Sequence, residues 1–95
     1  MQQKYEAMFL IKPDLTKDQR TSLLNQVNDT ITKNHGKISA SNIWQEKRPL
    51  AFEIHKFKEA AYYLVNFEIE SEAVAHLKSA YKLMENILRL MITKQ

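Results

Sequence analysis

Apolar and polar residues alternate along four stretches of the chain, which is the pattern of a half-buried β-strand. In three of these stretches one set of alternate positions is uniformly apolar, and the other set is mixed. The uniformly apolar sets begin at Tyr5, Tyr63 and Leu88, and we expect each of them to face the buried side of a sheet. The predicted strands span residues 5–12, 37–54, 60–69 and 87–93.

The second of these stretches differs from the others because its alternation is interrupted. Residues 37–54 contain Pro49, which has no backbone N–H to donate to a neighbouring strand. We therefore expect an edge strand that either bends or breaks near residues 45–49. The polar residues 55–59 that follow predict a turn into the next strand.

Two stretches with apolar residues at helical spacing separate the strands. The first is predicted at residues 17–34, after a capping box that begins at Thr16. The only glycine, Gly36, follows it and is placed to end the helix in a left-handed conformation. The second helix is predicted to begin at Ser71, a natural N-cap, and to end near Asn86.

The predicted elements follow one another in the order β-α-β-β-α-β within 95 residues, a length typical of one domain. Because βαβ crossovers are right-handed, this order predicts a split βαβ fold, the ferredoxin-like sandwich. In this α+β fold two helices cover one face of a four-stranded antiparallel sheet, and the first and third strands are central. We expect residues 1–95 to form a single domain of this kind.

The mixed positions of the three regular strands are expected on the face that the helices leave uncovered. Five of these nine positions are apolar, although an open sheet face in water is usually more polar. Single exposed apolar residues are common, but a contiguous patch on adjacent strands tends to mark an interaction site, so we favour a protein partner. Glu6 and Arg89, on the same face, are expected to form a weak surface ion pair. The candidate partner-binding residues are Met8, Leu10, Tyr62, Leu64 and Met91.

The basic residues form two candidate phosphate contacts. The net charge is +3 and the pI about 9.2, which permits a polyanionic partner without requiring one. Antiparallel pairing of the first and last strands would bring Lys4 close to Lys94, and Lys47 and Arg48 lie beside the predicted bend. Each spot could hold a phosphate, and solvated surface charge is the alternative.

The residues that most catalytic and metal sites need are missing. The absence of cysteine excludes disulfides, thiolate metal sites and cysteine nucleophiles. Three scattered histidines do not form a ligand cluster, and one glycine cannot build a phosphate-cradling loop, which argues against an acyl phosphatase. No apolar run approaches the roughly 20 residues of a membrane helix, and the first residues lack the order of a signal peptide. We therefore expect a cytosolic or equivalent location and no enzyme activity, cofactor, metal, small-molecule substrate or membrane contact.

Four segments of the chain occur in an order and spacing that together are fairly specific. Tyr5-Glu6 opens an apolar strand, which Pro13-Asp14-Leu15-Thr16 follows. Lys47-Arg48 leads into Pro49-Leu50-Ala51-Phe52-Glu53-Ile54, and Asn86-Ile87-Leu88-Arg89-Leu90-Met91 lies near the end. In these segments the chain resembles the bacterial-type family of small-subunit ribosomal protein six over nearly its whole length.

The chain also departs from the pattern of that family in three places. Gln45-Glu46 stand where the family usually has a glycine, and Phe52 replaces a tyrosine. The chain ends at Gln95, where many members continue in a long polar tail.

The resemblance implies a structural, non-enzymatic protein of the small subunit of a cytoplasmic or organellar ribosome. Such a protein would bind the central domain of small-subunit ribosomal RNA together with ribosomal protein eighteen, as a heterodimer. An apolar open face would suit the protein partner, and modest positive charge would suit the RNA. With Lys94 from the strand pairing, the candidate RNA-binding residues are Lys4, Tyr5, Lys47, Arg48, Arg89 and Lys94.

One other interpretation remains open at this point. The same fold occurs in small regulatory domains, and the open face could pair with a second copy or with another protein. In this alternative the chain is a ferredoxin-like self-associating or protein-binding domain without RNA.

Overall fold

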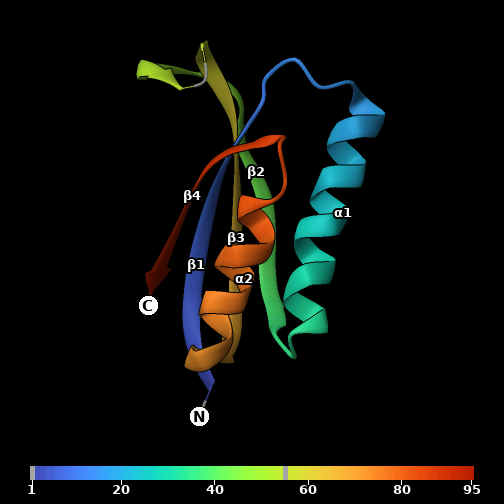
Figure 1. The fold of residues 1–95 in the computed structure, drawn as a ribbon, viewed down its shortest axis with the longest axis vertical. Helices are drawn as coiled ribbons and strands as arrows, with labels where there is room; N and C mark the ends of the chain where they lie inside the picture. Colours follow the sequence, from blue (N-terminus) through green and yellow to red (C-terminus); the bar gives the residue numbers. More distant parts are fainter. Residues whose placement is uncertain (1, 55) are drawn as a thin grey trace.

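Four strands form one antiparallel sheet, and two helices pack on one of its faces (Figure 1). In chain order the elements are β1 (Gln2–Ile11), α1 (Lys17–Lys33), β2 (Lys37–Ile54), β3 (Phe57–Glu70), a 3₁₀ turn (Ser71–Ala73), α2 (Val74–Lys82) and β4 (Ile87–Lys94). This computed structural model describes residues 2–54 and 56–95, and the side chains of all of these except residues 43–48. The strand order β2-β3-β1-β4 makes β1 and β3 central, which confirms the predicted ferredoxin-like sandwich.

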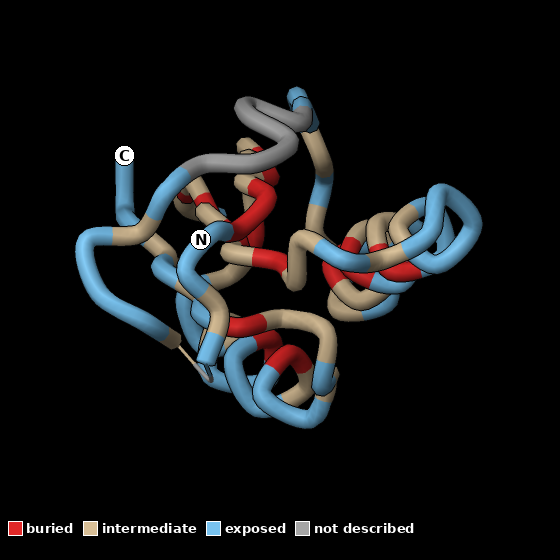
Figure 2. Tube along the Cα trace, turned by 90° about the horizontal axis from the view of Figure 1, so that it is seen from above, coloured by how far each residue is buried: buried red, intermediate tan, exposed pale blue. Residues whose placement is uncertain are grey.

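The core lies between the sheet and the helices, where the buried residues of Figure 2 gather. Phe9 of β1 contacts Tyr81 of α2 edge to face, with ring centroids 4.9 Å apart, and so links the sheet to the helix layer. Within the sheet, Tyr5 stacks on its cross-strand neighbour Phe67 at 5.8 Å. Buried Leu23, Val27, Ile31, Leu77 and Tyr81 come from the helices. From the two central strands the buried side chains of the core cluster are Tyr5, Ala7, Phe9, Ile11, Ala61, Tyr63, Val65, Phe67 and Ile69.

The start of α1 is built as the sequence predicts. The Gln19 backbone N–H donates to the Thr16 hydroxyl oxygen at 3.1 Å. In return the Thr16 backbone N–H donates to the Gln19 side-chain oxygen at 3.0 Å. These two bonds are a complete capping box, which satisfies donors that the first helical turn leaves free.

The end of α1 differs from the prediction, because Gly36 is not the left-handed residue. His35 adopts that conformation, with φ 66°, and no glycine has positive φ. The Gly36 N–H donates to the Ile31 carbonyl at 2.9 Å and the His35 N–H to the Thr32 carbonyl at 3.1 Å, which is a Schellman motif. Gly36 is required for space instead, since a Cβ there would lie 2.5 Å from Ile31 Cγ2.

The second helix is shorter than predicted at both ends. Ser71 opens a 3₁₀ turn without a side-chain cap, and α2 begins only at Val74. It ends at Lys82 rather than near Asn86, and the chain then turns so that Ile87 can pair with Ile11. Pairing in the sheet therefore takes precedence over another turn of helix.

A bulge near the start of β4 changes which of its side chains reach the core. Leu10 pairs with Arg89, but Ile11 pairs with Ile87, so Leu88 is an extra residue. Ile87, Leu90 and Ile92 pack against the core, whereas Leu88, although only 8% exposed, is not part of that cluster. The expectation that Leu88 faces the helices is therefore wrong.

The hairpin between β2 and β3 is tighter than the predicted polar turn. Ile54 pairs directly with Phe57, and Lys56 has φ 70°. β2 is one edge strand whose pairing with β3 shifts register four times, including between Gln45 and Arg48. A bent edge strand was one of the two predicted forms, and it is the one observed.

Two tyrosines tie α1 to the rest of the core. The Tyr63 hydroxyl donates to Asn28 Oδ1 at 3.0 Å, and the Tyr81 hydroxyl donates to the Val27 carbonyl oxygen at 2.7 Å. Burial, together with the nearby Tyr63, raises the pKa of Tyr81 well above its ordinary value. The neutral phenol is therefore the form that the folded chain holds.

Substitutions at Gly36 and His35 should change stability in opposite directions. Gly36→Ala places a methyl group against Ile31 and should lower the free energy of unfolding by about 1–3 kcal/mol. His35→Gly removes the cost of a left-handed side chain and should raise it by up to about 1 kcal/mol. Urea unfolding of both variants checks this, and a stable Gly36→Ala variant would contradict the close packing.

Alkaline pH should destabilise the chain partly through Tyr81. Above about pH 10 the unfolded chain ionises this phenol while the folded chain does not, so the unfolded state binds fewer protons and stability falls. Tyr81→Phe should cost about 1 kcal/mol at pH 7 through the lost hydrogen bond. Above pH 10 its stability should fall less steeply than that of the parent chain, by up to about 1.4 kcal/mol per pH unit. Parallel curves in urea unfolding between pH 8 and 12 would contradict this.

Candidate protein and nucleic-acid interface

Five apolar side chains lie on the sheet face opposite the helices. We call Met8, Leu10, Tyr62, Leu64 and Met91 the open-face patch. They occupy the alternate positions between the buried residues of β1 and β3 and the core-facing residues of β4, and none belongs to the core cluster. Met91 is 49% exposed, and the other four are half-buried. The structure therefore places all five candidate partner residues on one uncovered surface.

The centre of the patch is a row of three apolar side chains across the sheet. Met8 of β1 pairs with Leu64 of β3 on one side and with Met91 of β4 on the other. Directly opposed residues in antiparallel strands have Cβ atoms about 4.5–5.5 Å apart, so these side chains are immediate neighbours on the open face. Because they are adjacent, a partner would cover them as one surface.

The neighbouring row adds a cation at its edge. Leu10 pairs with Tyr62 of β3 and with Arg89 of β4, and Arg89 is exposed. The candidate RNA residue Arg89 therefore lies beside the open-face patch, on the same side of the sheet. A protein that covers the patch and an RNA that contacts Arg89 would lie next to each other.

The row on the other side of the centre is polar. Glu6 pairs with Asn66 and Thr93 and so bounds the patch. Arg89 lies opposite Leu10, four residues further along β1, which is about 14 Å at strand spacing. The expected ion pair between Glu6 and Arg89 is therefore wrong, because the strand register separates the two side chains.

Lys4 and Lys94 are close along the backbone but point to different faces. The Gln95 N–H donates to the Lys4 carbonyl at 2.8 Å, which holds the ends of β1 and β4 together. Lys94, however, pairs with core-facing Tyr5 and lies on the helix side, whereas Lys4 shares the phase of the open-face patch. The two exposed lysines therefore do not form a single phosphate pocket, and Lys4 lies directly opposite Glu68 of β3.

The other candidate RNA residues differ in how far the structure describes them. Tyr5 is 8% exposed and is mainly a core side chain, although with Lys4 and Gln95 it lines a shallow hollow at the sheet end. The side chains of Lys47 and Arg48 lie outside the described residues. Arg48 is placed only by its backbone, opposite Ala60.

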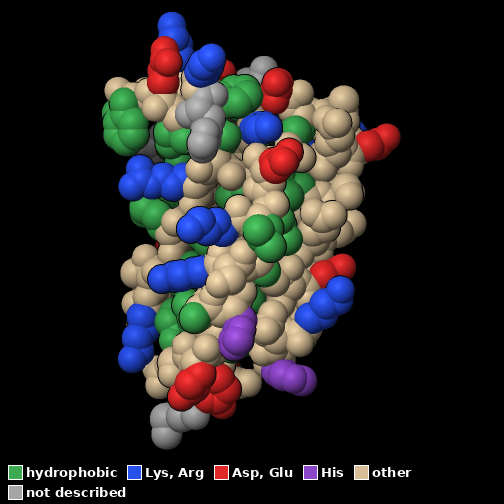
Figure 3. Space-filling view, viewed as in Figure 1, with side chains coloured by type: hydrophobic (Ala, Val, Ile, Leu, Met, Phe, Trp, Pro, Cys, Tyr) green, Lys and Arg blue, Asp and Glu red, His purple; other side chains and the backbone are tan. Residues whose placement is uncertain are grey.

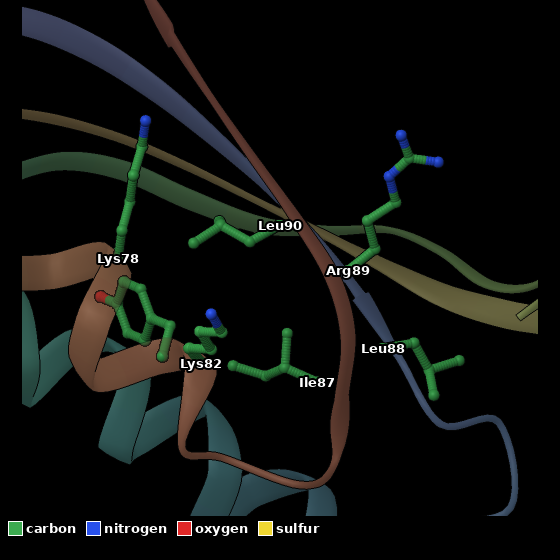
Figure 4. A pocket seen from close by; sticks show the side chains of 7 residues that line it. Lys78, Lys82, Ile87, Leu88, Arg89 and Leu90 are labelled. Atoms are coloured by element: carbon green, nitrogen blue, oxygen red, sulfur yellow. The ribbon is translucent and has the colours of Figure 1, made fainter. Parts of the chain in front are cut away.

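A groove between α2 and β4 is lined by the predicted residue Arg89 and by two basic residues that the sequence interpretation missed, Lys78 and Lys82 (Figure 4). Lys78 and Lys82 project from α2, and Arg89 projects from β4. The signal was present in the sequence, since residues four apart on a helix share a face. What the sequence could not give was the end of α2 and the path of β4 beside it.

The described residues show no sign of catalytic or metal chemistry. Among them no three His, Cys, Asp or Glu side chains gather as metal ligands. The one large pKa shift among them belongs to Tyr81, whose hydroxyl is bonded inside the core. No helix in the described part of the chain is long and apolar enough to span a membrane.

Comparison with known proteins identifies relatives of the chain over nearly its whole length. The family model described as ribosomal protein S6 matches residues 4–94. The small ribosomal subunit protein bS6 of Fusobacterium nucleatum is 37% identical over 92 residues, which are 97% of this chain and 97% of that protein. The protein of the same name from Helicobacter pylori is 36% identical over 90 residues, and the chain spans 63% of its length.

A solved structure agrees with these sequence relatives. The crystal structure of 30S ribosomal protein S6 from Thermotoga maritima matches with a TM-score of 0.92 and 27% sequence identity. The match covers 100% of this chain and 89% of that one.

Proposed function

The chain belongs to the ribosomal protein S6 family, a non-enzymatic component of the small ribosomal subunit, and from this premise we propose how it engages its neighbours. The open-face patch holds ribosomal protein eighteen. Basic residues beside the patch contact the central domain of small-subunit ribosomal RNA. The observation that carries this proposal is the row of apolar side chains across three strands, on the face that the helices leave uncovered.

The apolar patch supports a protein partner through the free energy of burial. Fully burying one Leu or Met side chain contributes about 1.5–3 kcal/mol. The five residues of the patch are already partly covered in the free chain, so a partner gains less than this from each, but on the order of several kcal/mol in all. Polar Glu6 and Thr93 at the rim would set the orientation of the partner rather than the affinity.

The positions of the basic residues, rather than their number, support an RNA contact. Lys4 and Arg89 are exposed on the same face as the patch, near opposite ends of β1. Phosphate contacts of this kind orient a protein on RNA and carry no sequence information. RNA affinity should therefore depend strongly on salt, while the affinity for the protein partner should depend on it only weakly.

A negative charge in the patch should weaken the protein complex without unfolding the chain. Met8→Asp and Leu64→Asp each place a carboxylate in the central apolar row. We expect each to raise the Kd for ribosomal protein eighteen at least tenfold, or about 1.4 kcal/mol, in isothermal titration calorimetry.

The matched control for this test is Asn25→Asp, which adds the same charge at an exposed position of α1. It should leave the Kd unchanged, and circular dichroism checks that all variants are folded. If both patch variants bind ribosomal protein eighteen as the parent does, the patch is not the partner surface.

Loss of Arg89 should weaken RNA binding in a salt-dependent way. Arg89→Ala should lower the affinity of the heterodimer for a central-domain RNA fragment and reduce the slope of log K against log salt by about 1. Arg89→Lys keeps the charge and should retain most of that slope. An unchanged slope in filter-binding titrations of Arg89→Ala would remove this residue from the RNA contact.

A further inference from the structure

The groove between α2 and β4 contains two lysines that the proposed contacts do not use. Its volume is about 450 Å³, and its lining includes Lys78, Lys82 and Arg89 but no carboxylate. An adjoining hollow shares Lys82 with it and adds Lys12, with Glu85 as its one acidic residue. Among the residues that line the groove and the hollow, basic side chains therefore outnumber the one carboxylate.

The surface around the groove is basic as well. On the face shown in Figure 3, Lys and Arg side chains form a column over α2 and β4, and Asp and Glu side chains lie above and below it. Lys78 and Lys82 are exposed, and their spacing along α2 places their Cβ atoms about 5–6 Å apart. Such a column attracts a linear polyanion along its axis.

Basic side chains lie on both sides of the edge strand β4. Lys78 and Lys82 lie on the helix side of β4, and the Arg89 guanidinium lies on the other side of the strand (Figure 4). A phosphate backbone that follows the free edge of β4 could contact all three residues. Since Arg89 also borders the open-face patch, this path is continuous with the RNA contact proposed above.

The apolar residues of the groove offer little to a protein partner. Tyr81 and Leu88 are buried within the molecule, and Ile87 and Leu90 already pack against its core. A protein interface needs an apolar centre that its partner can desolvate, whereas phosphate contacts need exposed cations. The lining therefore favours a nucleic-acid backbone over an acidic protein segment.

We propose that Lys78 and Lys82 are a second phosphate-binding element, which holds the RNA backbone along the outer edge of β4. The proposal rests on the proposed function, because the RNA is the same small-subunit RNA that Arg89 contacts. It adds contacts from α2 to those from the sheet. The chain would then contact the RNA from both sides of β4.

The test measures RNA binding by a double variant in the complex with ribosomal protein eighteen. Lys78→Ala/Lys82→Ala leaves α2 intact, because both positions are exposed and alanine favours helix. Filter-binding titrations with a central-domain RNA fragment should show a slope of log K against log salt that is lower by up to about 2. Calorimetry should show unchanged affinity for ribosomal protein eighteen without RNA.

The control is Lys17→Ala/Lys33→Ala, which removes two exposed charges from α1 and gives the same net charge. It should retain the salt slope of the parent chain.

Equal slopes for the α2 variant and the parent would overturn the inference while the proposed function stands. If the parent complex does not bind the RNA, both the inference and the proposed function are overturned. If the α2 variant loses affinity for ribosomal protein eighteen but binds the RNA as the parent does, the inference is overturned and the groove is a protein-binding site.

Discussion

The architecture depends on the strict alternation of side chains in the two central strands. Every second residue of β1 from Tyr5 and of β3 from Ala61 is buried beneath the helices. Since neighbouring residues of a strand point to opposite faces, the intervening residues must lie on the other face. A shift of one residue in the pairing would exchange the two sets, so the core itself fixes which side chains remain available to a partner.

This constraint explains how one small fold can offer separate surfaces for the two contacts that we propose. The helix layer supplies stability and leaves one sheet face free, and the edge strand β4 borders both layers. Apolar residues gather at the centre of the free face, while cations gather at its edges and along α2. The proposed protein and RNA contacts would therefore lie side by side, the first based on apolar burial and the second on phosphate charge.

The sequence was sufficient to predict the fold and which alternate residues of the central strands face the helices, because hydrophobic periodicity determines both. It was insufficient where local preference competes with tertiary contacts. The expected roles of Gly36 and Ser71 came from capping preferences, yet close packing with Ile31 and a 3₁₀ turn decide those sites. Lys78 and Lys82 were missed because the groove that they line depends on the path of β4 beside α2. The bulge at Leu88 was missed because it leaves no mark in the alternation of apolar and polar residues.

The central claim is that the uncovered sheet face is where the chain meets its protein neighbour in the ribosome. Methyl NMR spectra of the chain, recorded as ribosomal protein eighteen is added, test this most directly, because Met8, Leu64 and Met91 report the open face and Leu23 and Leu77 report the core. The account predicts that the first three methyl signals shift strongly while those of Leu23 and Leu77 change little. Shifts confined to the methyl groups of helix residues, with Met8, Leu64 and Met91 unaffected, would contradict it.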